Sequence, residues 1–270
     1  MIDRVCISIN NRCNLACKYC HFHEKGLSED VPMDVPKILE NIKAYAKSSF
    51  KIGFVGNGEP LLDFKLLKEY IEFLSDQTYI SIYTITNGTV QLESDDWKFL
   101  ENHNVNVGFS IDGPEEIHNL YRGKSFKCVM ANVERYKEAT GHYPTFNATV
   151  GKEVIENAAE VISFFKQFGT RITFSRMIGK YGISLEEYRD FMNEAEKQIS
   201  VRRGALDCTM YGGKCGAGAN NFFFSNGKVY LCGNCVDLSP LGSSDMSFEE
   251  LEKLSLNFDR NYCYKESICE

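Results

Sequence analysis

The amino-acid sequence predicts an α/β protein: an open, partial (β/α)6 barrel, similar to part of a TIM barrel, followed by a small cysteine-rich module. Two observations carry this prediction. Short apolar runs alternate with longer amphipathic stretches over about the first 200 residues. Beyond them the sequence becomes rich in glycine and cysteine, and six of the eleven cysteines follow residue 207.

Periodicity predicts the elements of the barrel. The expected strands are the short runs rich in β-branched residues, at 4–9, 51–55, 80–86, 105–111, 145–150 and 171–175. The expected helices carry apolar residues at three- and four-residue spacing, at 35–48, 64–76, 94–102, 126–140, 154–168 and 184–200. This alternation predicts parallel strands joined by crossover helices, with ligands gathered at the carboxyl ends of the strands.

The chain divides into a barrel at residues 1–203 and a cysteine-rich module at residues 204–270. In the module, 221–225 and 228–231 flank an Asn226-Gly227 pair, which predicts a β-hairpin. The first strand begins by Arg4, so we expect no peptide-recognition domain before the barrel.

Composition excludes several classes of protein. A formal net charge of −7 argues against binding to nucleic acid, because phosphate backbones are held by clustered Lys and Arg. The first apolar run is too short for a signal peptide, and no run approaches the ~20 apolar residues of a membrane span, so we expect a cytoplasmic protein. Cysteines in a reducing compartment indicate metal or redox chemistry rather than disulfides.

Three cysteines, Cys13, Cys17 and Cys20, follow the first expected strand. Iron–sulfur clusters normally take four cysteines, so three thiolates on one loop would leave one iron open to another ligand. The alternative is a zinc knuckle built on Cys17 and Cys20 with His21 and His23, but that site leaves Cys13 without a role.

The C-x3-C-x2-C spacing, with Tyr19 before the last cysteine, resembles the radical S-adenosylmethionine (radical SAM) superfamily. The resemblance implies a 4Fe-4S cluster on Cys13, Cys17 and Cys20 whose open iron binds S-adenosylmethionine. It also implies an electron donor such as flavodoxin or ferredoxin, and reductive cleavage of S-adenosylmethionine to a 5′-deoxyadenosyl radical that takes hydrogen from a substrate. The protein would supply orientation and exclude water and oxygen.

The segment Gly56-Asn57-Gly58-Glu59-Pro60 resembles the Gly-Gly-Glu-Pro motif of that superfamily. The resemblance implies that Asn57, Gly58 and Glu59 bind the cofactor, with backbone and a carboxylate presented to its ammonium group. Asn57 replaces the first glycine of the motif, which puts the backbone conformation there in question.

Further polar residues end the expected strands and are candidates for the cofactor pocket. Asn87 follows the third strand and Ser110 lies on the fourth, in segments resembling pocket-lining parts of the superfamily; Asn-Gly and Asp-Gly-Pro are also ordinary turn sequences. Other strand-end candidates, whose orientation one sequence does not show, are Asn147, Thr149, Ser175 and Arg176.

The stretch from Ser110 to Gly123 resembles a narrower group, the sulfatase-maturing enzymes and the maturases of ribosomally made peptides. The resemblance implies a peptide substrate, held directly or delivered by a separate leader-binding protein. His118 and Arg122 would then shape the substrate entrance, unless they are surface residues of a helix. Cys6 and Cys128 are interpreted as small buried side chains.

The last cysteines resemble the auxiliary-cluster module called SPASM in its long form and Twitch in its short one. Cys208, Cys215 and Cys232 would hold one auxiliary 4Fe-4S cluster, with the fourth ligand taken from Cys235, Cys263 or Cys269. The long form uses seven cysteines for two clusters, and this region has six. A zinc ribbon formed by Cys232, Cys235, Cys263 and Cys269 is the structural alternative.

The thiols left over bear on the reaction. If Cys235, Cys263 or Cys269 faces the substrate, it would return a hydrogen atom and give an epimerised residue; otherwise oxidation to a thioether or carbon–carbon crosslink is expected. The resemblance to sulfatase-maturing enzymes implies an aspartate that acts as a base directly after the cysteine matching Cys232. Gly233 stands at that place, so sulfatase maturation is disfavoured. The alternatives are a small-molecule radical dehydrogenase or cyclase and a non-catalytic, zinc-stabilised binding module.

Overall fold

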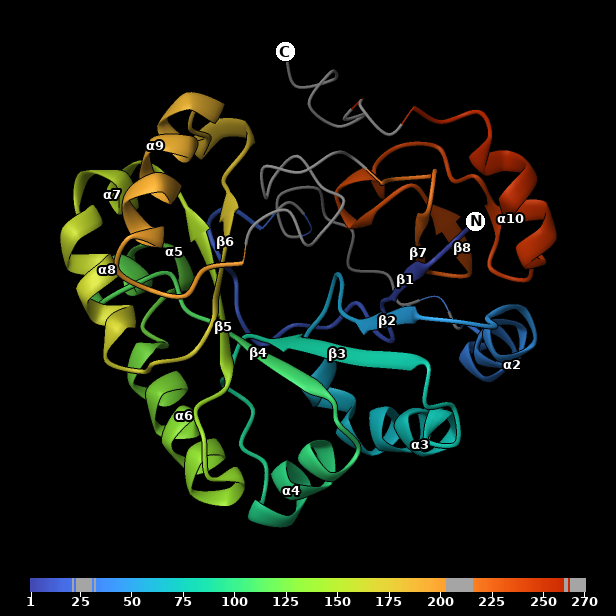
Figure 1. The fold of residues 1–270 in the computed structure, drawn as a ribbon, viewed down its shortest axis with the longest axis horizontal. Helices are drawn as coiled ribbons and strands as arrows, with labels where there is room; N and C mark the ends of the chain where they lie inside the picture. The colour runs from blue at the N-terminus through green and yellow to red at the C-terminus, as the bar shows by residue number, and fades with distance from the viewer. Residues whose placement is uncertain (21, 23–30, 32, 203–215, 260–261, 263–270) are drawn as a thin grey trace.

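A computed structural model describes residues 1–20, 22, 31, 33–202, 216–259 and 262. Within these residues the strands form one curved sheet in the order β6-β5-β4-β3-β2-β1-β7-β8-β9 (Figure 1). Their bounds are β1 Arg4–Ile7, β2 Phe50–Phe54, β3 Ile80–Thr86, β4 Asn106–Ser110, β5 Thr145–Val150, β6 Ile172–Arg176, β7 Asn221–Ser225, β8 Lys228–Tyr230 and β9 Gly242–Ser243. All six predicted barrel strands are confirmed to within one or two residues.

Helices cover the outer side of the sheet (Figure 1). They are α2 Val35–Tyr45, α3 Phe64–Leu74, α4 Ser94–Asn102, α5 Glu115–Arg122, α6 Phe126–Thr140, α7 Lys152–Glu156, α8 Ala158–Lys166, α9 Leu185–Glu196 and α10 Phe248–Ser255, with short 3-10 turns η1 Pro60–Asp63, η2 Gly179–Tyr181 and η4 Gly233–Cys235. The single helix expected at 154–168 is interrupted at Asn157, which separates α7 from α8. None of these helices is long and apolar enough to cross a membrane.

The hairpin predicted at residues 221–231 is present and lies in the barrel sheet. Its turn has positive φ at both Asn226 (50°) and Gly227 (67°), the conformation of a type I′ turn. Strand β7 pairs with β1 in parallel, with Arg4 opposite Asn221, so the barrel gains a seventh parallel strand from near the end of the chain. Because residues 203–215 lie outside the described residues, the boundary at 203/204 stays a prediction.

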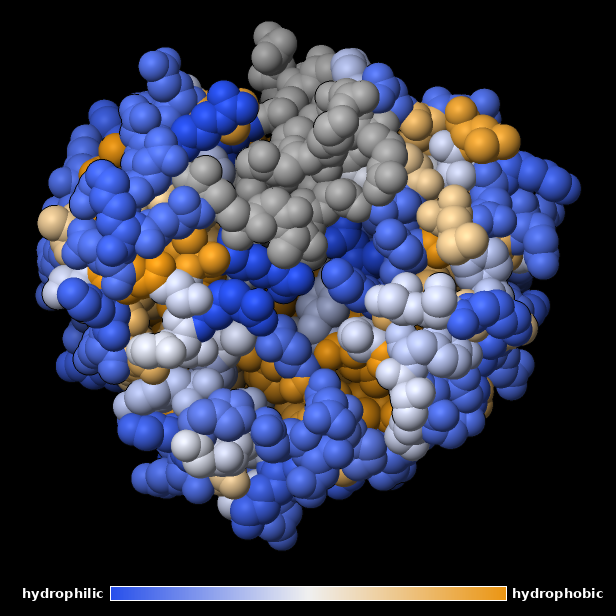
Figure 2. All heavy atoms as spheres, viewed as in Figure 1, coloured by the Kyte–Doolittle hydropathy of each residue, from blue (hydrophilic) through white to orange (hydrophobic). Residues whose placement is uncertain are grey.

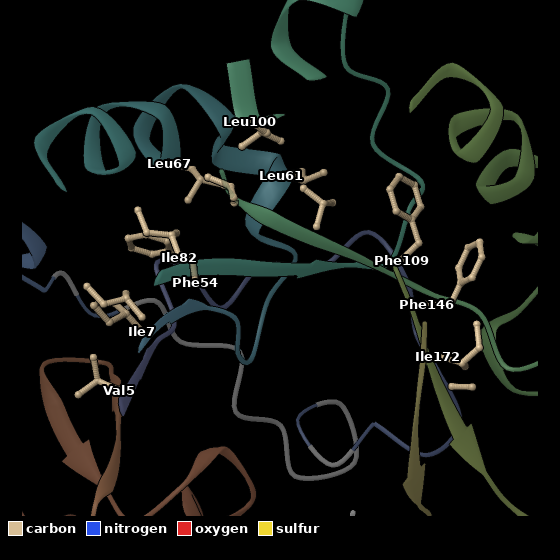
Figure 3. Packing of buried hydrophobic residues seen from close by; sticks show 14 of the residues in the cluster. Val5, Ile7, Phe54, Leu61, Leu67, Ile82, Leu100, Phe109, Phe146 and Ile172 are labelled. Atoms are coloured by element: carbon tan, nitrogen blue, oxygen red, sulfur yellow. The ribbon is translucent and has the colours of Figure 1, made fainter. Parts of the chain in front are cut away.

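The two faces of the sheet differ in polarity. Alternate residues such as Val5, Ile7, Phe54 and Ile82 point outward and pack against the helices, forming one apolar core (Figure 3). The opposite face bounds the lumen of the barrel, where the neighbours of these residues along the strands are largely polar. This separation leaves the lumen for ligands while the outer layer supplies stability.

Candidate functional site

The three cysteines of the first loop lie directly beyond the carboxyl end of β1. Cys13, Cys17 and Cys20 are all partly buried, and the Cys20 N–H donates to the Cys17 carbonyl at 3.0 Å, which closes a turn. Burial raises the pKa of the Cys17 thiol to about 11 and also raises the pKa of Cys13. Cluster binding must therefore remove protons that this loop holds firmly at neutral pH.

No three His, Cys, Asp or Glu side chains of the described residues converge closely enough to hold a single metal ion. A zinc knuckle needs its ligands around one atom, and two of its four proposed ligands lie outside the described residues. A 4Fe-4S cluster is different, because each cysteine binds a different iron atom and the sulfurs stand apart. His21 and His23, the other proposed zinc ligands, lie outside the described residues.

The cysteine loop is fixed to the Gly56–Pro60 segment at the end of β2. The Glu59 N–H donates to the Arg12 carbonyl at 2.7 Å, and Asn10 Nδ2 donates to the Glu59 carbonyl at 3.1 Å. At Gly58 an added Cβ would lie 1.9 Å from Asn10 Oδ1 and 2.5 Å from the Arg12 carbonyl oxygen. Only glycine permits this approach, so the close packing of the two loops explains Gly58.

The Glu59 carboxylate is buried and accepts three hydrogen bonds from its own chain. The donors are the Thr86 hydroxyl at 2.7 Å, the Asn87 N–H at 2.6 Å and the Leu61 N–H at 3.0 Å. Burial outweighs these contacts and raises the pKa of Glu59. Glu59 thereby joins the end of β3 to the end of β2, and a cofactor contact would come in addition to this role.

Asn57 takes an ordinary negative φ. In the described part of the chain the residues other than glycine with a positive φ are Asn104 and Asn226. The Asn57 side chain is buried, with Nδ2 donating to Ser225 Oγ of β7 at 2.8 Å, while the backbone N–H donates to Ser8 Oγ at 3.0 Å. Its Oδ1 has no hydrogen-bond partner among the described residues. Asn57 therefore connects three strand ends without backbone strain.

Asn87 lies beside the cysteine loop. Its Nδ2 is 3.6 Å from Cys13 Sγ and donates to Asn14 Oδ1 at 2.8 Å. Its Oδ1 accepts hydrogen bonds from the Thr89 N–H and hydroxyl. Ser110 is also buried, at the end of β4 opposite Asn147 of β5. Both residues occupy the strand ends at which the sequence placed them.

Asp112 is the residue that the sequence reasoning missed. This fully buried carboxylate accepts four hydrogen bonds: from Arg122 Nε at 2.8 Å, Arg122 Nη2 at 3.2 Å, the Thr149 N–H at 2.9 Å and the Tyr19 hydroxyl at 2.8 Å. Burial alone would raise the pKa of Asp112, but the Arg122 guanidinium holds it below its usual value. The ionised carboxylate thus connects β4, β5, α5 and the cysteine loop.

The alternative interpretation of His118 and Arg122 as surface residues is wrong. His118 is fully buried, with Nε2 2.8 Å from Ser125 Oγ, and burial lowers its pKa to about 4. Arg122 is buried against Asp112, and its guanidinium carbon lies 5.3 Å from the centre of the Tyr19 ring. Both face inward because they lie on the side of α5 that also buries Ile117 and Tyr121.

The two remaining barrel cysteines, both predicted to be small buried side chains, differ in environment. Cys6 is partly buried, with Sγ 3.3 Å from the Tyr83 hydroxyl. Cys128 is exposed, which contradicts the prediction of a buried side chain. The buried face of α6 is formed by Val129, Val133 and Tyr136 with Asn132, and Cys128 lies beside that stripe rather than in it.

In the cysteine-rich region, Cys232 and Cys235 lie together at the end of the hairpin. Their sulfur atoms are 3.3 Å apart, and Cys235 is buried. Glycine at position 233 leaves no carboxylate between them. The other predicted ligands or hydrogen donors, Cys208, Cys215, Cys263 and Cys269, lie outside the described residues.

The chain is similar in sequence and in fold to known proteins. The cysteine-type anaerobic sulfatase-maturating enzyme of Clostridium perfringens is 28% identical over 92% of this chain and 79% of its own length. The solved structure of anSMEcpe with bound AdoMet superposes with a TM-score of 0.78 at 23% identity, covering 98% of this chain and 87% of that one.

A second solved structure, Streptococcus suis SuiB bound to the precursor peptide SuiA, gives a TM-score of 0.75 at 15% identity over 100% of this chain and 73% of that one. At these identities both structures show the fold, a partial barrel of parallel strands with antiparallel strands at the carboxyl-terminal side. The model of the Radical SAM superfamily matches residues 7–165, from the end of β1 into α8. The chain therefore belongs to the radical SAM superfamily.

Proposed function

We propose that this protein is a radical SAM enzyme that modifies a ribosomally made peptide. The observation that carries the proposal is the Asp112 centre. The Ser110–Gly123 stretch resembles peptide-modifying members of the superfamily, and its Asp112 and Arg122 hold Tyr19 of the cysteine loop. The segment associated with that group is thus built into the site where radical chemistry would begin.

We assign the superfamily cluster to Cys13, Cys17 and Cys20, and S-adenosylmethionine to their surroundings. Three partly buried thiols on one loop, with no fourth described beside them, match a cluster that keeps one iron open. The expected contacts to S-adenosylmethionine come from Tyr19, Asn57, Gly58, Glu59, Asn87 and Ser110. The unpartnered, buried Oδ1 of Asn57 is an acceptor that a ligand ammonium would satisfy.

When bound, the cluster and S-adenosylmethionine supply a radical that removes a hydrogen atom from the substrate. The chain's own contribution is to hold the geometry. Glu59 keeps the ends of β2 and β3 at one separation, and Asp112 keeps Tyr19 against the barrel. Rigid placement of this kind limits the side reactions of a radical.

A peptide substrate is favoured over a small molecule by the relatives. The SuiB structure is described with a precursor peptide, and the Clostridium perfringens relative is named for maturation of a sulfatase. In this chain Gly233 stands where such sulfatase-maturing relatives are expected to carry a basic aspartate, so we propose a different peptide. The product would be a thioether or carbon–carbon crosslink, or an epimerised residue.

An auxiliary 4Fe-4S cluster on Cys208, Cys215 and Cys232 is part of the proposal, with Cys235 as its fourth ligand. Cys235 is only 2% exposed and its sulfur lies 3.3 Å from Cys232 Sγ. A hydrogen donor must reach the substrate, and a buried thiol beside another ligand is placed to bind the cluster instead. Cys263 and Cys269 then remain as candidate hydrogen donors.

The test uses anaerobically reconstituted protein, a reductant, S-adenosylmethionine and candidate precursor peptides in deuterated water. We expect 5′-deoxyadenosine together with a peptide that gains one mass unit on epimerisation or loses two on crosslinking. Cys13→Ala should abolish both products, whereas Cys128→Ala, an exposed thiol away from the cluster loop, should abolish neither. Zinc without acid-labile sulfide, or no 5′-deoxyadenosine with any substrate, would overturn the proposal.

A further inference from the structure

The turn of the β7–β8 hairpin lies against the cysteine loop. Asn226 Oδ1 accepts one hydrogen bond from Asn11 Nδ2 at 2.5 Å and a second from the Val31 N–H at 3.3 Å. Asn11 comes before Cys13 in the sequence, and Val31 comes after Cys20. A single oxygen atom, 215 residues away from Asn11 along the chain, therefore binds the chain both before and after the three cysteines.

The hairpin holds Asn226 at a fixed place beside the barrel. On one side the Ser8 N–H donates to the Phe224 carbonyl at 2.9 Å, which continues the pairing of β7 with β1 almost to the turn. On the other side the Ser244 N–H, next to β9, donates to the Gly227 carbonyl of the turn at 2.9 Å. A partner that is itself fixed by the sheet can restrain the loop rather than move with it.

The requirements of the turn do not account for the side chain of Asn226. A type I′ turn needs positive φ, and glycine meets that requirement as well as asparagine does. What glycine lacks is the oxygen that the two donors share. The hydrogen bond from the Lys18 N–H to the Tyr121 carbonyl, at 2.9 Å, is another polar contact of this loop with the barrel. Hydrophilic side chains also border the hollow at the centre of the molecule (Figure 2), so hydrogen bonds have a large share in holding the loop.

Three thiolates must reach one cluster together, so the loop has to keep its cysteines in one arrangement. Restraining two points of a flexible segment excludes conformations in which the thiols diverge, and this lowers the conformational entropy lost when the cluster binds. We propose that Asn226 is a positioning residue of the cluster site, which keeps the cysteine loop closed through its two hydrogen bonds, which we call the Asn226 bridge. This role rests on the proposed function, because it presupposes a cluster on Cys13, Cys17 and Cys20.

Hydrogen–deuterium exchange of the anaerobically reconstituted, full-length protein tests the Asn226 bridge. Asn226→Gly keeps the turn and removes the oxygen, so peptides covering residues 10–20 should exchange about tenfold faster than in the wild type. Asn226→Asp keeps an acceptor oxygen at the same place and should restore the wild-type exchange rate. Asn104→Gly is the matched control, because Asn104 is an exposed asparagine that also has positive φ (52°), and it should leave the exchange of residues 10–20 unchanged.

A second readout is the electron paramagnetic resonance spectrum of the reduced protein, recorded with and without S-adenosylmethionine. A cluster with an open iron changes its spectrum when S-adenosylmethionine binds, whereas a cluster with four cysteine ligands has no open iron for it. The change in the spectrum therefore reports the cysteine loop separately from the auxiliary cluster. We expect a loss of this response in Asn226→Gly, and a response like that of the wild type in Asn226→Asp and Asn104→Gly.

Two outcomes overturn the positioning role: equal exchange of residues 10–20 in the wild type and Asn226→Gly, or exchange in Asn226→Asp that is as fast as in Asn226→Gly. If the exchange is equal while the wild type forms 5′-deoxyadenosine and a modified peptide, the Asn226 bridge fails and the proposed function stands. If the exchange differs as expected but no 5′-deoxyadenosine forms with any peptide, the proposed function fails and the restraint on the loop by Asn226 stands.

Discussion

The hydroxyl of Tyr19 donates a 2.8 Å hydrogen bond to the buried carboxylate of Asp112, although 93 residues separate the two in the sequence. The backbone supports the same connection, because the Lys18 N–H donates to the Tyr121 carbonyl at 2.9 Å. The cysteine loop is therefore held by the far side of the barrel as well as by its own strand. Its geometry depends on α5, which carries Tyr121 and Arg122.

Replacing Asp112 by alanine should strongly destabilise the protein. The substitution leaves the buried Arg122 guanidinium without its anion, which costs about 3–5 kcal/mol of unfolding free energy. Urea denaturation measures this loss. Asp95→Ala, which breaks an exposed ion pair with Lys98, should cost about 0–1 kcal/mol. Similar small losses of unfolding free energy in both variants would show that the ion pair between Asp112 and Arg122 does not stabilise the fold.

The pH dependence of stability should report His118. Its pKa in the folded protein is about 4, below the ordinary histidine value of 6.5, so between these values the unfolded state binds more protons. Stability contributed by the neutral imidazole is complete above about pH 6.5 and is lost as the pH falls toward 4. The loss is roughly 3 kcal/mol at about 1.4 kcal/mol per pKa unit.

His118→Gln should remove this part of the acid sensitivity, because glutamine does not titrate and can still bond Ser125. The exposed His142 provides the matched control, and His142→Gln should leave the acid limb of the stability curve nearly as it is in the wild type. Denaturation curves recorded between pH 4 and pH 7 compare the three proteins. An unchanged acid limb in His118→Gln would contradict the buried, neutral assignment.

Gly58→Ala should disrupt the cysteine loop. The added Cβ meets Asn10 Oδ1 at 1.9 Å and the Arg12 carbonyl oxygen at 2.5 Å, so the loop must move. We expect reconstituted protein to hold less iron and sulfide at the first cluster and to cleave S-adenosylmethionine more slowly. Gly233→Ala has its nearest contact at 3.4 Å, an ordinary packing distance, and should retain wild-type unfolding free energy. Full iron content in Gly58→Ala would count against this packing.

Ser225→Ala should weaken binding of S-adenosylmethionine from a distance. The hydroxyl of Ser225 accepts a hydrogen bond from the buried Asn57 side chain, and its loss leaves that donor unsatisfied at a cost of about 1–3 kcal/mol. Equilibrium dialysis of the reconstituted protein measures the change in affinity. Ser75→Ala, which removes an exposed hydroxyl that bonds the Glu72 carbonyl, should bind S-adenosylmethionine normally. Equal affinities in the two variants would show that Ser225 of the β7–β8 hairpin does not support binding of S-adenosylmethionine.

Local pattern was enough to predict most elements of the barrel. Strands β1 to β6 are short, β-branched and regularly spaced, and α4 and α6 have the predicted bounds. Helix α10 was not predicted, because its 8 residues are too few to show a clear helical period, although the Ser247–Glu250 capping box is a readable start signal. The break between α7 and α8 at Asn157 depends on packing that the periodicity of 154–168 did not show.

The long-range part of the site was not predictable in the same way. Asp112 stands in an Asp-Gly-Pro sequence that is an ordinary turn signal, and nothing near it indicates Tyr19 as a partner. His118 and Arg122 have polar side chains on a short helix, so composition pointed to the surface. Which strands pair, and which polar side chains meet, is decided by the three-dimensional arrangement rather than by any window of sequence.

The parallel pairing of β7 with β1 has a consequence for how the protein is made. The first strand leaves the ribosome more than 200 residues before its partner at Asn221–Ser225, so the sheet stays one parallel strand short throughout most of synthesis. The hydrogen bond from Asn57 to Ser225 likewise cannot form until Ser225 has been synthesised. Such distant pairing makes folding slow, and it means that a nascent chain carries its cysteine loop long before the walls that protect a cluster exist. Loading of iron and sulfur is therefore expected to follow release of the chain rather than accompany its growth.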